Sequence, residues 1–563
     1  MPLPYELRLG VTGHRSVADE DAVGAAIDSL LARIAATLNA PGTALSCVVI
    51  SPLAAGADRI VARAALDRLD ARLEVVTPLP VPDYRMDFDT GSDRDEFDTL
   101  LARAAVVDEL PGPRASTLPG SISYAQRRDA AYHRVGERVV DACEILIAVW
   151  NGRRAAGMGG TADIIAHALR RDRLVIWIHA DQPNAPPSVV RRITYRHVTD
   201  DEAVVETAAF PDDRKELSPG YHQQASYFRD GGVDDAAVGR SAAALREQLR
   251  GTAERAGIAA SALTGIQESL VPEFVRADAL AVKYQRRHVL VVNGILRLAA
   301  TAVTMALIQL LFFPAQTWLS LIEIAAMTAV FGLWRGSRRG AWHEKWLHDR
   351  FLAEQLRAAM FVVLADARQP ASDDRTLEFY RGPKHWLSQV VTSLAAAARQ
   401  RLSPIPLDPL RRLLVDGWLR DQQAFHERNA HRKAHQAHRR HQLGFALFGG
   451  TLLMATLHFL HVGDMDTAGR PWLNPAVWIT FLALVFPVWA GVVHAITTQL
   501  ELERVAERST RMATTLAGLA DRMERALTQD ELAETARETS AVMLGETHDW
   551  WVLLSFQDVK LHV

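Results

Sequence analysis

Four apolar stretches constrain most strongly what this chain can fold into. They cover residues 289–313, 317–334, 442–460 and 475–498. A helix of about 20 apolar residues crosses the hydrocarbon core of a bilayer, and each stretch comes close to or exceeds that length. The alternative, buried core helices of a soluble protein, is disfavoured because helices apolar on every face are rare in such cores. The stretches therefore predict four membrane-spanning helices in two closely spaced pairs.

Basic residues around these stretches predict their orientation. Lys283, Arg286 and Arg287 precede the first stretch, and further arginines follow the second and precede the third. The turn inside the first pair carries no charge, and the loop inside the second carries one basic residue, Arg470. The positive-inside rule then places both termini and the segment 340–440 in the cytosol, with two short hairpins outside.

Two charged residues lie inside the first pair of predicted spans. At 1.5 Å per residue, Arg297 lies about 12 Å and Glu323 about 16 Å from the cytosolic ends of their spans. These depths are close enough for the two side chains to pair. Such a pair either fixes the packing of two helices or lines a pore, and both interpretations stay open.

The first 180 residues show a different pattern, in which short apolar runs rich in β-branched residues alternate with amphipathic stretches. The apolar runs lie at 7–11, 45–51, 73–78, 145–150 and 174–179, and the amphipathic stretches near 21–38, 56–69, 93–105, 126–142 and 161–171. The alternation predicts an α/β domain with a Rossmann-like, doubly wound parallel sheet. Ligands of such sheets bind beyond the carboxyl ends of the strands.

Three loops that follow predicted strands have features of a phosphate-binding site. Small residues at a helix N-terminus let main-chain N–H groups approach an anion, although in any single loop they also suit an ordinary turn. We expect Arg15 to neutralise a phosphate, Asp58 to accept from a ribose hydroxyl and Thr161 to donate its hydroxyl. The candidate nucleotide-binding residues are Thr12, Gly13, His14, Arg15, Gly56, Ala57, Asp58, Asn151, Gly152, Gly159, Gly160, Thr161 and Asp163.

These loops give the domain a resemblance to the SLOG superfamily, which includes the LOG cytokinin-activating hydrolases, the DNA-processing DprA proteins and the nucleotide-sensing region of TRPM channels. The matching motifs are GVTGHR at 10–15, SPLAAGADR at 51–59, the segment from Pro78 to Phe88, and AVWNGRRAAGMGGTADI at 148–164. The resemblance implies a nucleotide or nucleotide-derived ligand, and no cofactor is expected.

One departure from the SLOG pattern bears on catalysis. The hydrolase branch carries a PGGxGTxxE motif, whose glutamate follows three residues after the threonine. Here that position is Ile164, and Asp163 falls one residue early. The general acid or base that hydrolysis requires is thus absent from its expected place, which favours a sensor. A substitute role for Asp163 or Asp58 stays open.

The membrane part resembles the SLATT family of two-span effector domains, which accompany SLOG domains in bacterial conflict systems. Paired spans are flanked by helical segments with Trp, Arg and Glu, such as Trp342, Arg350 and Glu354, and the pattern occurs twice. The predicted domains are a nucleotide-binding domain at 1–180, a connector at 181–236, and SLATT-like units at 237–410 and 411–563. The resemblance implies an oligomeric effector that perturbs the membrane as a pore.

Composition excludes several other classes of protein. The net charge of −3 provides no general positive field, so no nucleic acid partner is expected. The two cysteines, Cys47 and Cys143, suit a reducing compartment, and the start of the chain shows no signal peptide. A tract of five histidines between 426 and 441 has no cysteine nearby and no evident second shell for a metal, so we expect a solvated or headgroup-facing basic helix and no metal site.

The leading hypothesis is therefore a multi-pass protein of the bacterial inner membrane, gated by an intracellular nucleotide signal and acting in antiviral or stress defence. Its expected partners are the nucleotide, the lipid bilayer and further copies of the chain. Two alternatives belong to other classes: a membrane-tethered nucleotide or nucleoside N-glycosidase, and a non-catalytic membrane scaffold.

Overall fold

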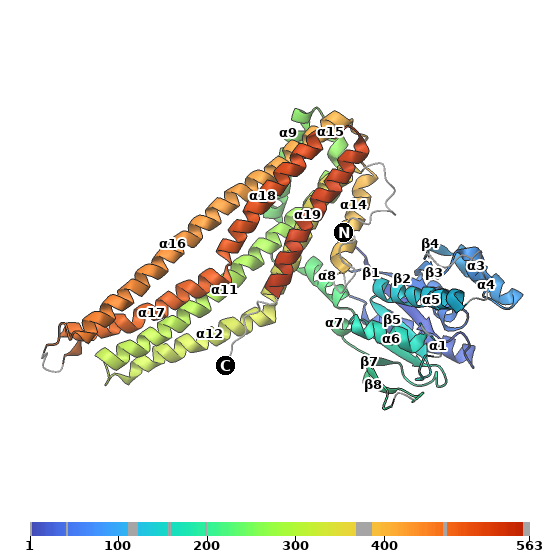
Figure 1. The fold of residues 1–563 in the computed structure, drawn as a ribbon, viewed down its shortest axis with the longest axis horizontal. Helices are drawn as coiled ribbons and strands as arrows, with labels where there is room; N and C mark the ends of the chain where they lie inside the picture. The colour runs from blue at the N-terminus through green and yellow to red at the C-terminus, as the bar shows by residue number, and fades with distance from the viewer. Residues whose placement is uncertain are drawn as a thin grey trace. The chain divides into compact units, whose positions relative to one another are not determined.

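The computed structural model describes residues 3–40, 43–110, 122–155, 157, 159–197, 200–366, 385–465 and 470–555 (Figure 1). Contacts divide the chain into two compact units. The sheet unit comprises Met1–Gly231 and Glu378–Ser393, and the helical unit comprises Gly232–Leu377 and Leu394–Val563. The chain thus changes unit three times, and the last change falls within helix α14 (His385–Arg399).

Among the described residues, eight strands form one sheet in the order β4-β3-β2-β1-β5-β6-β7-β8. Strands β1 to β6 are parallel, and β7 and β8 join antiparallel. The strands are β1 (Tyr5–Gly13), β2 (Leu45–Ser51), β3 (Arg72–Thr77), β4 (Ala104–Glu109), β5 (Ile145–Trp150), β6 (Leu174–His179), β7 (Ser188–Thr194) and β8 (Val204–Ala209). The expected α/β domain with a mostly parallel sheet is therefore confirmed.

Helices pack on both sides of the β1 strand. Successive residues of a strand point to opposite faces, and Gly10 faces Val139 of helix α5 (Ile122–Ala142) and Cys143, which directly follows that helix. On the other face, Gly13 approaches Ala57 at the start of helix α2 (Ala57–Leu69). Helix α1 (Glu20–Thr37) packs against α2, and α6 (Thr161–Arg170) packs against α5. Both faces of the central strands are therefore buried, which explains their continuous apolar runs.

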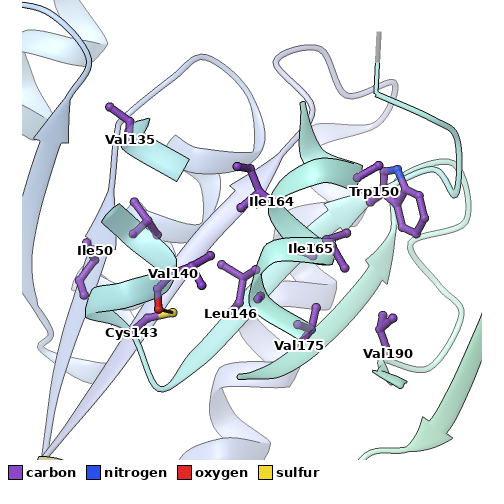
Figure 2. Packing of buried hydrophobic residues seen from close by; sticks show 14 of the residues in the cluster. Ile50, Val135, Val140, Cys143, Leu146, Trp150, Ile164, Ile165, Val175 and Val190 are labelled. Carbon is purple, nitrogen blue, oxygen red and sulfur yellow. Dashed lines mark hydrogen bonds between the residues drawn. The ribbon is translucent and has the colours of Figure 1, made fainter. Parts of the chain in front are cut away.

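The core between the sheet and helices α5 and α6 is built from branched aliphatic side chains (Figure 2). Ile50 of β2, Leu146 of β5 and Val175 of β6 meet Val140 of α5 and Ile164 of α6. All five are at most 2 % exposed. Ile164, which the expected resemblance places at the glutamate position of the hydrolase motif, is thus a core residue that anchors α6 to the sheet.

The sheet extends beyond the strands expected from the sequence. Strand β4 lies within a segment partly assigned to a helix, and β7 and β8 lie in the expected connector 181–236. In β4 and β8 most side chains are exposed or half-buried, so neither has the apolar run that marked the central strands. Edge strands commonly lack that signal because one side of them faces solvent. The sheet therefore continues past residue 180.

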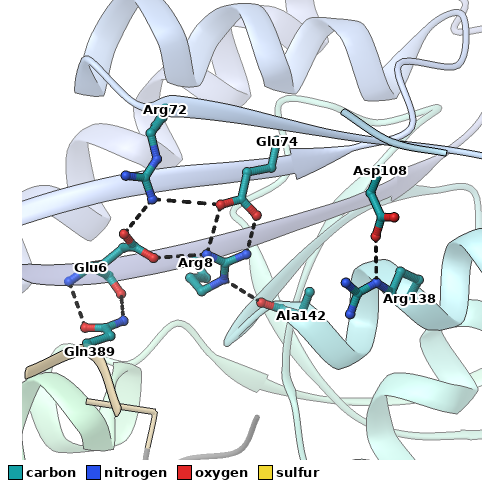
Figure 3. Close-up of polar contacts among 8 residues, drawn as sticks. All are labelled: Glu6, Arg8, Arg72, Glu74, Asp108, Arg138, Ala142 and Gln389. Carbon is teal, nitrogen blue, oxygen red and sulfur yellow. Dashed lines mark hydrogen bonds and ion pairs between the residues drawn. The ribbon is translucent and has the colours of Figure 1, made fainter. Parts of the chain in front are cut away.

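Ion pairs cross the strands at the amino-terminal side of the sheet (Figure 3). Arg8 of β1 pairs with Glu74 of β3 and with Glu6, and Arg72 donates to Glu6 at 2.7 Å. The Arg8 side chain is 14 % exposed, and the two carboxylates around it raise the pKa of its guanidinium despite its burial. These contacts fix the register of β1, β2 and β3 at the end of the sheet opposite the loops described below.

A distant segment completes the sheet unit. The side-chain amide of Gln389 in α14 donates to the Glu6 carbonyl at 2.6 Å, and its oxygen accepts from the Glu6 N–H at 3.1 Å (Figure 3). Trp386 is 1 % exposed, donates to Gln223 at 3.1 Å and packs against Tyr227 with ring centroids 5.7 Å apart. The first half of α14 is therefore part of the sheet unit.

In the described part of the chain, four helices are long and apolar enough to cross a membrane. They are α11 (Val271–Phe312), α12 (Ser320–Gly340), α16 (Arg420–Phe459) and α17 (Pro475–Gln499). Much of their apolar surface is exposed, with Phe445 and Phe448 of α16 at 73 % and 67 %. Such exposure is expected of helices that face lipid rather than water.

The helical unit has a repeated arrangement. In each half, a long helix (α11 or α16) is followed by a second apolar helix, and a residue with positive φ, Ala341 or Glu501, then directly precedes the next helix. A further helix, α13 (Trp342–Ala365) or α18 (Leu502–Glu524), then packs against the long helix of its own half. The two pairs of apolar stretches thus belong to two halves with the same order of elements.

The helix before α11 is interrupted. The sequence predicts a continuous helical segment from 237 into the first span, whereas α9 (Asp235–Ala256) ends at Gly257 in the left-handed region (φ 81°) and α11 begins at Val271. The N–H of Gly257 caps α9 by donating to Glu254 at 3.0 Å. Glycine enters this conformation without steric cost, which makes it a common helix terminator.

No ion pair joins Arg297 and Glu323 within the described residues. Leu333 of α12 packs against Gly294, near the level of Arg297, whereas Ser320 bonds to Gln309 near the other end of α11. Glu323 lies one turn from Ser320 and therefore far along the hairpin from Arg297. The expected depth of Glu323 was counted from the end of the apolar stretch at residue 334. Helix α12 continues to residue 340, six residues further, so Glu323 lies farther from the cytosolic end of its helix than expected.

Candidate functional site

The candidate site lies beyond the carboxyl ends of β1, β2 and β5, which are adjacent parallel strands. From β1 the chain first adds β2, β3 and β4 on one side, and then returns to add β5 and β6 on the other. The loops after β1 and β5 therefore lead to opposite sides of the sheet. In open α/β sheets, ligands bind in the crevice between two such loops. All thirteen candidate residues of the sheet unit lie in or next to the loops after β1, β2 and β5.

His14 joins the three loops. Its main-chain N–H donates to Val149 at the end of β5, at 3.2 Å, and its carbonyl accepts from the N–H of Ala57 in α2, at 3.1 Å. Its imidazole Nε2 accepts from the main-chain N–H of Asn151, at 3.1 Å. The loops that the sequence singled out separately therefore meet at one residue.

Gly56 is required where the second loop crosses the first. Its φ is +78°, and a Cβ added there would lie 2.5 Å from the carbonyl oxygen of Arg15 and 2.6 Å from that of His14. Only glycine combines this backbone conformation with such a close approach. The preceding turn is held by Ser51, whose hydroxyl accepts from the N–H of Leu53 at 3.0 Å.

Asp58 is a buried carboxyl group in the first turn of α2. It is 5 % exposed, and burial raises its pKa to about 7. A hydrogen bond from the main chain of Ala54 and the positive charges of Arg15 and Arg59 oppose that rise. Asp58 therefore changes protonation state near neutral pH, which is the property expected of a group that exchanges protons with a ligand.

A second carboxyl group, Asp87, faces the same cation. It lies between α3 (Val81–Arg85) and α4 (Gly91–Ala102), and its side chain is 8 % exposed. Burial raises its pKa to about 6, the charge of Arg15 opposes the rise, and Asp83 adds to it. Arg128 and the hydroxyl of Tyr132, both on α5, donate to its carboxylate.

Aromatic rings line the space around Arg15. The guanidinium carbon of Arg15 lies 5.1 Å from the ring centroid of Tyr132, a cation–π distance. Tyr84 is 1 % exposed, lies 6.1 Å from Tyr132 between centroids, and has its pKa raised by burial and by the negative charge of Asp58. Arg15 itself is exposed. It is therefore placed to receive an anion from solvent while its neighbours hold its position.

Arg59 is a buried cation that joins two segments next to the site. Its side chain is 1 % exposed and lies 4.4 Å from the ring centroid of Phe88. It donates to the carbonyl of Leu53 at 3.1 Å and pairs with Glu96 at 3.1 Å. The guanidinium thereby ties the loop after β2 to α4.

The third loop leads into the N-terminus of α6. Gly159 has φ +83°, and a Cβ there would lie 2.8 Å from the Cα of His133 in α5. Gly160 is the N-cap residue and has no side chain to cap the helix, so main-chain N–H groups are left for other acceptors. Asp163 accepts from the N–H of Gly159 at 3.3 Å, and Thr161 is 8 % exposed. Met158, which belongs to the matching motif, lies outside the described residues.

The remaining candidates have supporting positions. Thr12 lies within β1, paired with Ala148 of β5. The side chain of Asn151 accepts from the N–H of Arg153 at 3.1 Å, and Gly152 has φ +83°. These residues shape the loop after β5 through main-chain contacts.

Sequence reasoning missed the residues that α3 to α5 bring to the site, namely Tyr84, Asp87, Arg128 and Tyr132. Tyr84 and Asp87 belong to a motif that the resemblance singled out, but they were not assigned a role. Arg128 and Tyr132 lie on one helix face at i and i+4, and only the fold shows which face meets Asp87. Within the part of the chain that the structure describes, no group of three or more metal-ligating side chains is found.

No family model and no curated protein matches this chain.

Proposed function

We propose that the sheet unit binds an intracellular nucleotide or nucleotide-derived signal, and that binding gates the membrane-embedded helical unit. The observation that carries the proposal is the convergence of three loops on His14, at the point where the strand order reverses. In a Rossmann-like sheet this is the position where phosphate and ribose groups are bound. The exposed guanidinium of Arg15 and the free N-terminus of α6 suit phosphate, and Asp58 suits a ribose hydroxyl.

The helical unit supports the second half of the proposal. Its four apolar helices form two halves with the same order of elements, as expected of the duplicated SLATT-like effector that the sequence resembles. With both termini cytosolic in a bacterial inner membrane, the nucleotide site would face the cytosol. The expected action is oligomerisation and opening of a pore in response to viral infection or stress, with Arg297 and Glu323 as candidate polar groups of that pore.

A ligand shifts such an equilibrium only by binding the closed and open states with different affinities. The chain itself offers a route, because α14 contributes its first half to the sheet unit and its second half to the helical unit.

An N-glycosidase remains the second candidate, because one observation favours it. Burial raises the pKa of Asp58 to about 7, so this carboxyl can carry a proton near neutral pH, and a general acid needs such a proton for the leaving base. The resemblance places Ile164, a core residue, where the hydrolase motif has its glutamate, so Asp58 would have to act alone or with Asp87 or Asp163.

The full-length protein in detergent, and the same protein in liposomes loaded with a fluorescent dye, test the proposal. Mass spectrometry of small molecules that co-purify from virus-challenged cells identifies the ligand, and that ligand should release dye from wild-type liposomes only. Arg15→Gln should abolish release, whereas Arg68→Gln, an exposed cation on α2, should not. Tight binding without dye release would refute gating, and release of free base from the nucleotide would favour the glycosidase.

A further inference from the structure

Three cations of the helical unit gather without a carboxylate partner among the described residues. Arg297 of α11 lies close enough to Arg440 of α16 for their charges to repel, and Arg440 is a charged neighbour of Lys433, seven residues earlier on α16. We call Arg297, Lys433 and Arg440 the cationic cluster. No ion pair or side-chain hydrogen bond involves its members within the described part of the chain.

Arg440 is the member that most needs a partner. Its Nη1 atom is buried and has no hydrogen-bond partner in the described structure. A buried guanidinium N–H that lacks an acceptor is destabilising, and nearby positive charge makes it more so. An anion placed between Arg440 and Arg297 would supply the acceptor and remove the repulsion.

Lys433 is in the same situation. It is half-buried, and burial together with the charges of Arg432 and Arg440 lowers its pKa. The charged groups that act on it are all positive, although α18 packs along this helix and carries glutamates. An anion in the cluster would reverse that shift.

The depth of the cluster identifies the kind of anion. Arg440 lies two residues before the apolar stretch that begins at 442, the level at which a span meets the phosphate layer. Arg297 lies within the first span, but helical side chains tilt toward the N-terminus of their helix, which for α11 is the cytosolic end. Because the charge of Arg297 acts on Arg440, the two guanidinium groups lie near each other at this boundary.

An exposed apolar surface continues from the cluster. Gly444 and Phe448 follow Arg440 at i+4 and i+8 on one side of α16, and Phe448 is 67 % exposed. A Cβ added at Gly444 would meet nothing within 4 Å, so the side of the helix between Arg440 and Phe448 is open. A cation cluster followed by an open apolar surface matches a lipid, with its phosphate on the cluster and an acyl chain beside Phe448.

We infer that the cationic cluster binds the phosphate of an anionic phospholipid in the cytosolic leaflet. The inference rests on the membrane placement proposed above and is independent of nucleotide binding. It assigns a ligand to α16 that differs from the signal assigned to the sheet unit.

Native mass spectrometry of the delipidated full-length protein tests the inference, with phosphatidylglycerol and phosphatidylcholine offered in turn. Wild type should retain phosphatidylglycerol preferentially. Arg440→Gln and Lys433→Gln should each weaken retention about fivefold, the factor expected for one basic residue at an anionic surface. Arg440→Lys should recover part of the loss. Arg439→Gln is the matched control, because Arg439 is the exposed neighbour on the same helix and lies outside the cluster.

Three outcomes would overturn the inference. Equal retention of the two lipids, or an equal loss in Arg439→Gln, would show general attraction in place of a site. Displacement of the lipid by millimolar inorganic phosphate would show a site for free anions. Failure of the protein to enter liposomes at all would instead refute the membrane placement, and so separates the two proposals.

Discussion

The main-chain N–H of Asn151 donates to Nε2 of His14 at 3.1 Å, which joins the loop after β5 to the loop after β1. In this hydrogen bond the Nε2 atom of the imidazole is the acceptor. The side chain of His14 thus holds together the two loops that are proposed to bind the nucleotide.

Removing the hydrogen bond between His14 and Asn151 should weaken the contact between these two loops. His14→Leu deletes the acceptor, and loss of one hydrogen bond should weaken nucleotide affinity by about 2- to 10-fold, which corresponds to roughly 0.5–1.5 kcal/mol. Isothermal titration of the full-length protein with the co-purifying ligand measures the change. His14→Gln, which can offer an acceptor oxygen, should lose less, and an unchanged affinity in His14→Leu would contradict the role assigned here.

Asp58 should make the stability of the sheet unit depend on pH. Its pKa is raised from 3.8 to about 7 by burial, so the folded state favours the protonated form. The stabilisation is therefore complete below pH 4 and is lost as the pH rises through 7. At pH 8 the contribution of Asp58 to the free energy of unfolding is lower than at pH 4 by up to about 4 kcal/mol, since one pKa unit corresponds to about 1.4 kcal/mol.

Asp58→Asn removes this titration. Relative to wild type, the variant should gain thermal stability between pH 5 and pH 8, at roughly 2–4 °C for each kcal/mol in a domain of this size. Thermal melts of the ligand-free protein at the two pH values measure the gain. Asp70→Asn, at an exposed position after the same helix, should show no such dependence. Parallel pH profiles for wild type and Asp58→Asn would contradict the burial of this carboxyl.

Gly56→Ala should damage the site through the backbone. The left-handed φ and the clash with the Arg15 and His14 carbonyls leave no room for a methyl group. The free energy of unfolding should therefore fall by about 1–3 kcal/mol or more. Gly91→Ala is the control, because a Cβ at Gly91 meets nothing within 4 Å. Thermal unfolding of both variants gives the comparison, and equal melting temperatures would exclude a close crossing of the two loops.

The central strands could be predicted from sequence because each is buried on both faces. Strands β2, β5 and β6 begin and end at the predicted residues, since continuous apolar runs end where the chain meets solvent. Strands β4, β7 and β8 could not, because their pairing partners are supplied by the fold and their side chains carry no run of their own. The apolar helices were visible because their stretches are apolar on every face and about long enough to cross a bilayer.

The site was predicted in part. Arg15, Asp58 and the glycines of the α6 loop follow strands directly, and chain order alone brings the ends of parallel strands to one edge. Arg128 and Tyr132 lie in the middle of a helix, where an amphipathic pattern shows which side is buried but not what it meets. The pairing of Arg297 with Glu323 was not found, because the alignment of two helices depends on where each helix ends.

Trp386 should stabilise a sheet whose strands lie more than 170 residues earlier in the chain. Trp386→Ala empties a site that is 1 % exposed, and such truncations cost about 3–5 kcal/mol. Hydrogen exchange of the amides of β1 should therefore accelerate in the variant. Trp318→Ala, at a residue that is 57 % exposed in the helical unit, should leave β1 unchanged. Unaltered exchange in Trp386→Ala would show that the segment is dispensable.

The clasp of Gln389 on Glu6 has a consequence for how such a gene can change. The information for the sheet unit is written in two places, separated by the first pair of apolar helices. A recombination event that exchanges only the 5′ part of the gene would deliver a new sheet without the α14 segment that belongs with it. A new ligand specificity of the proposed site should therefore arise by point substitution in the loops, or by exchange of both coding segments together.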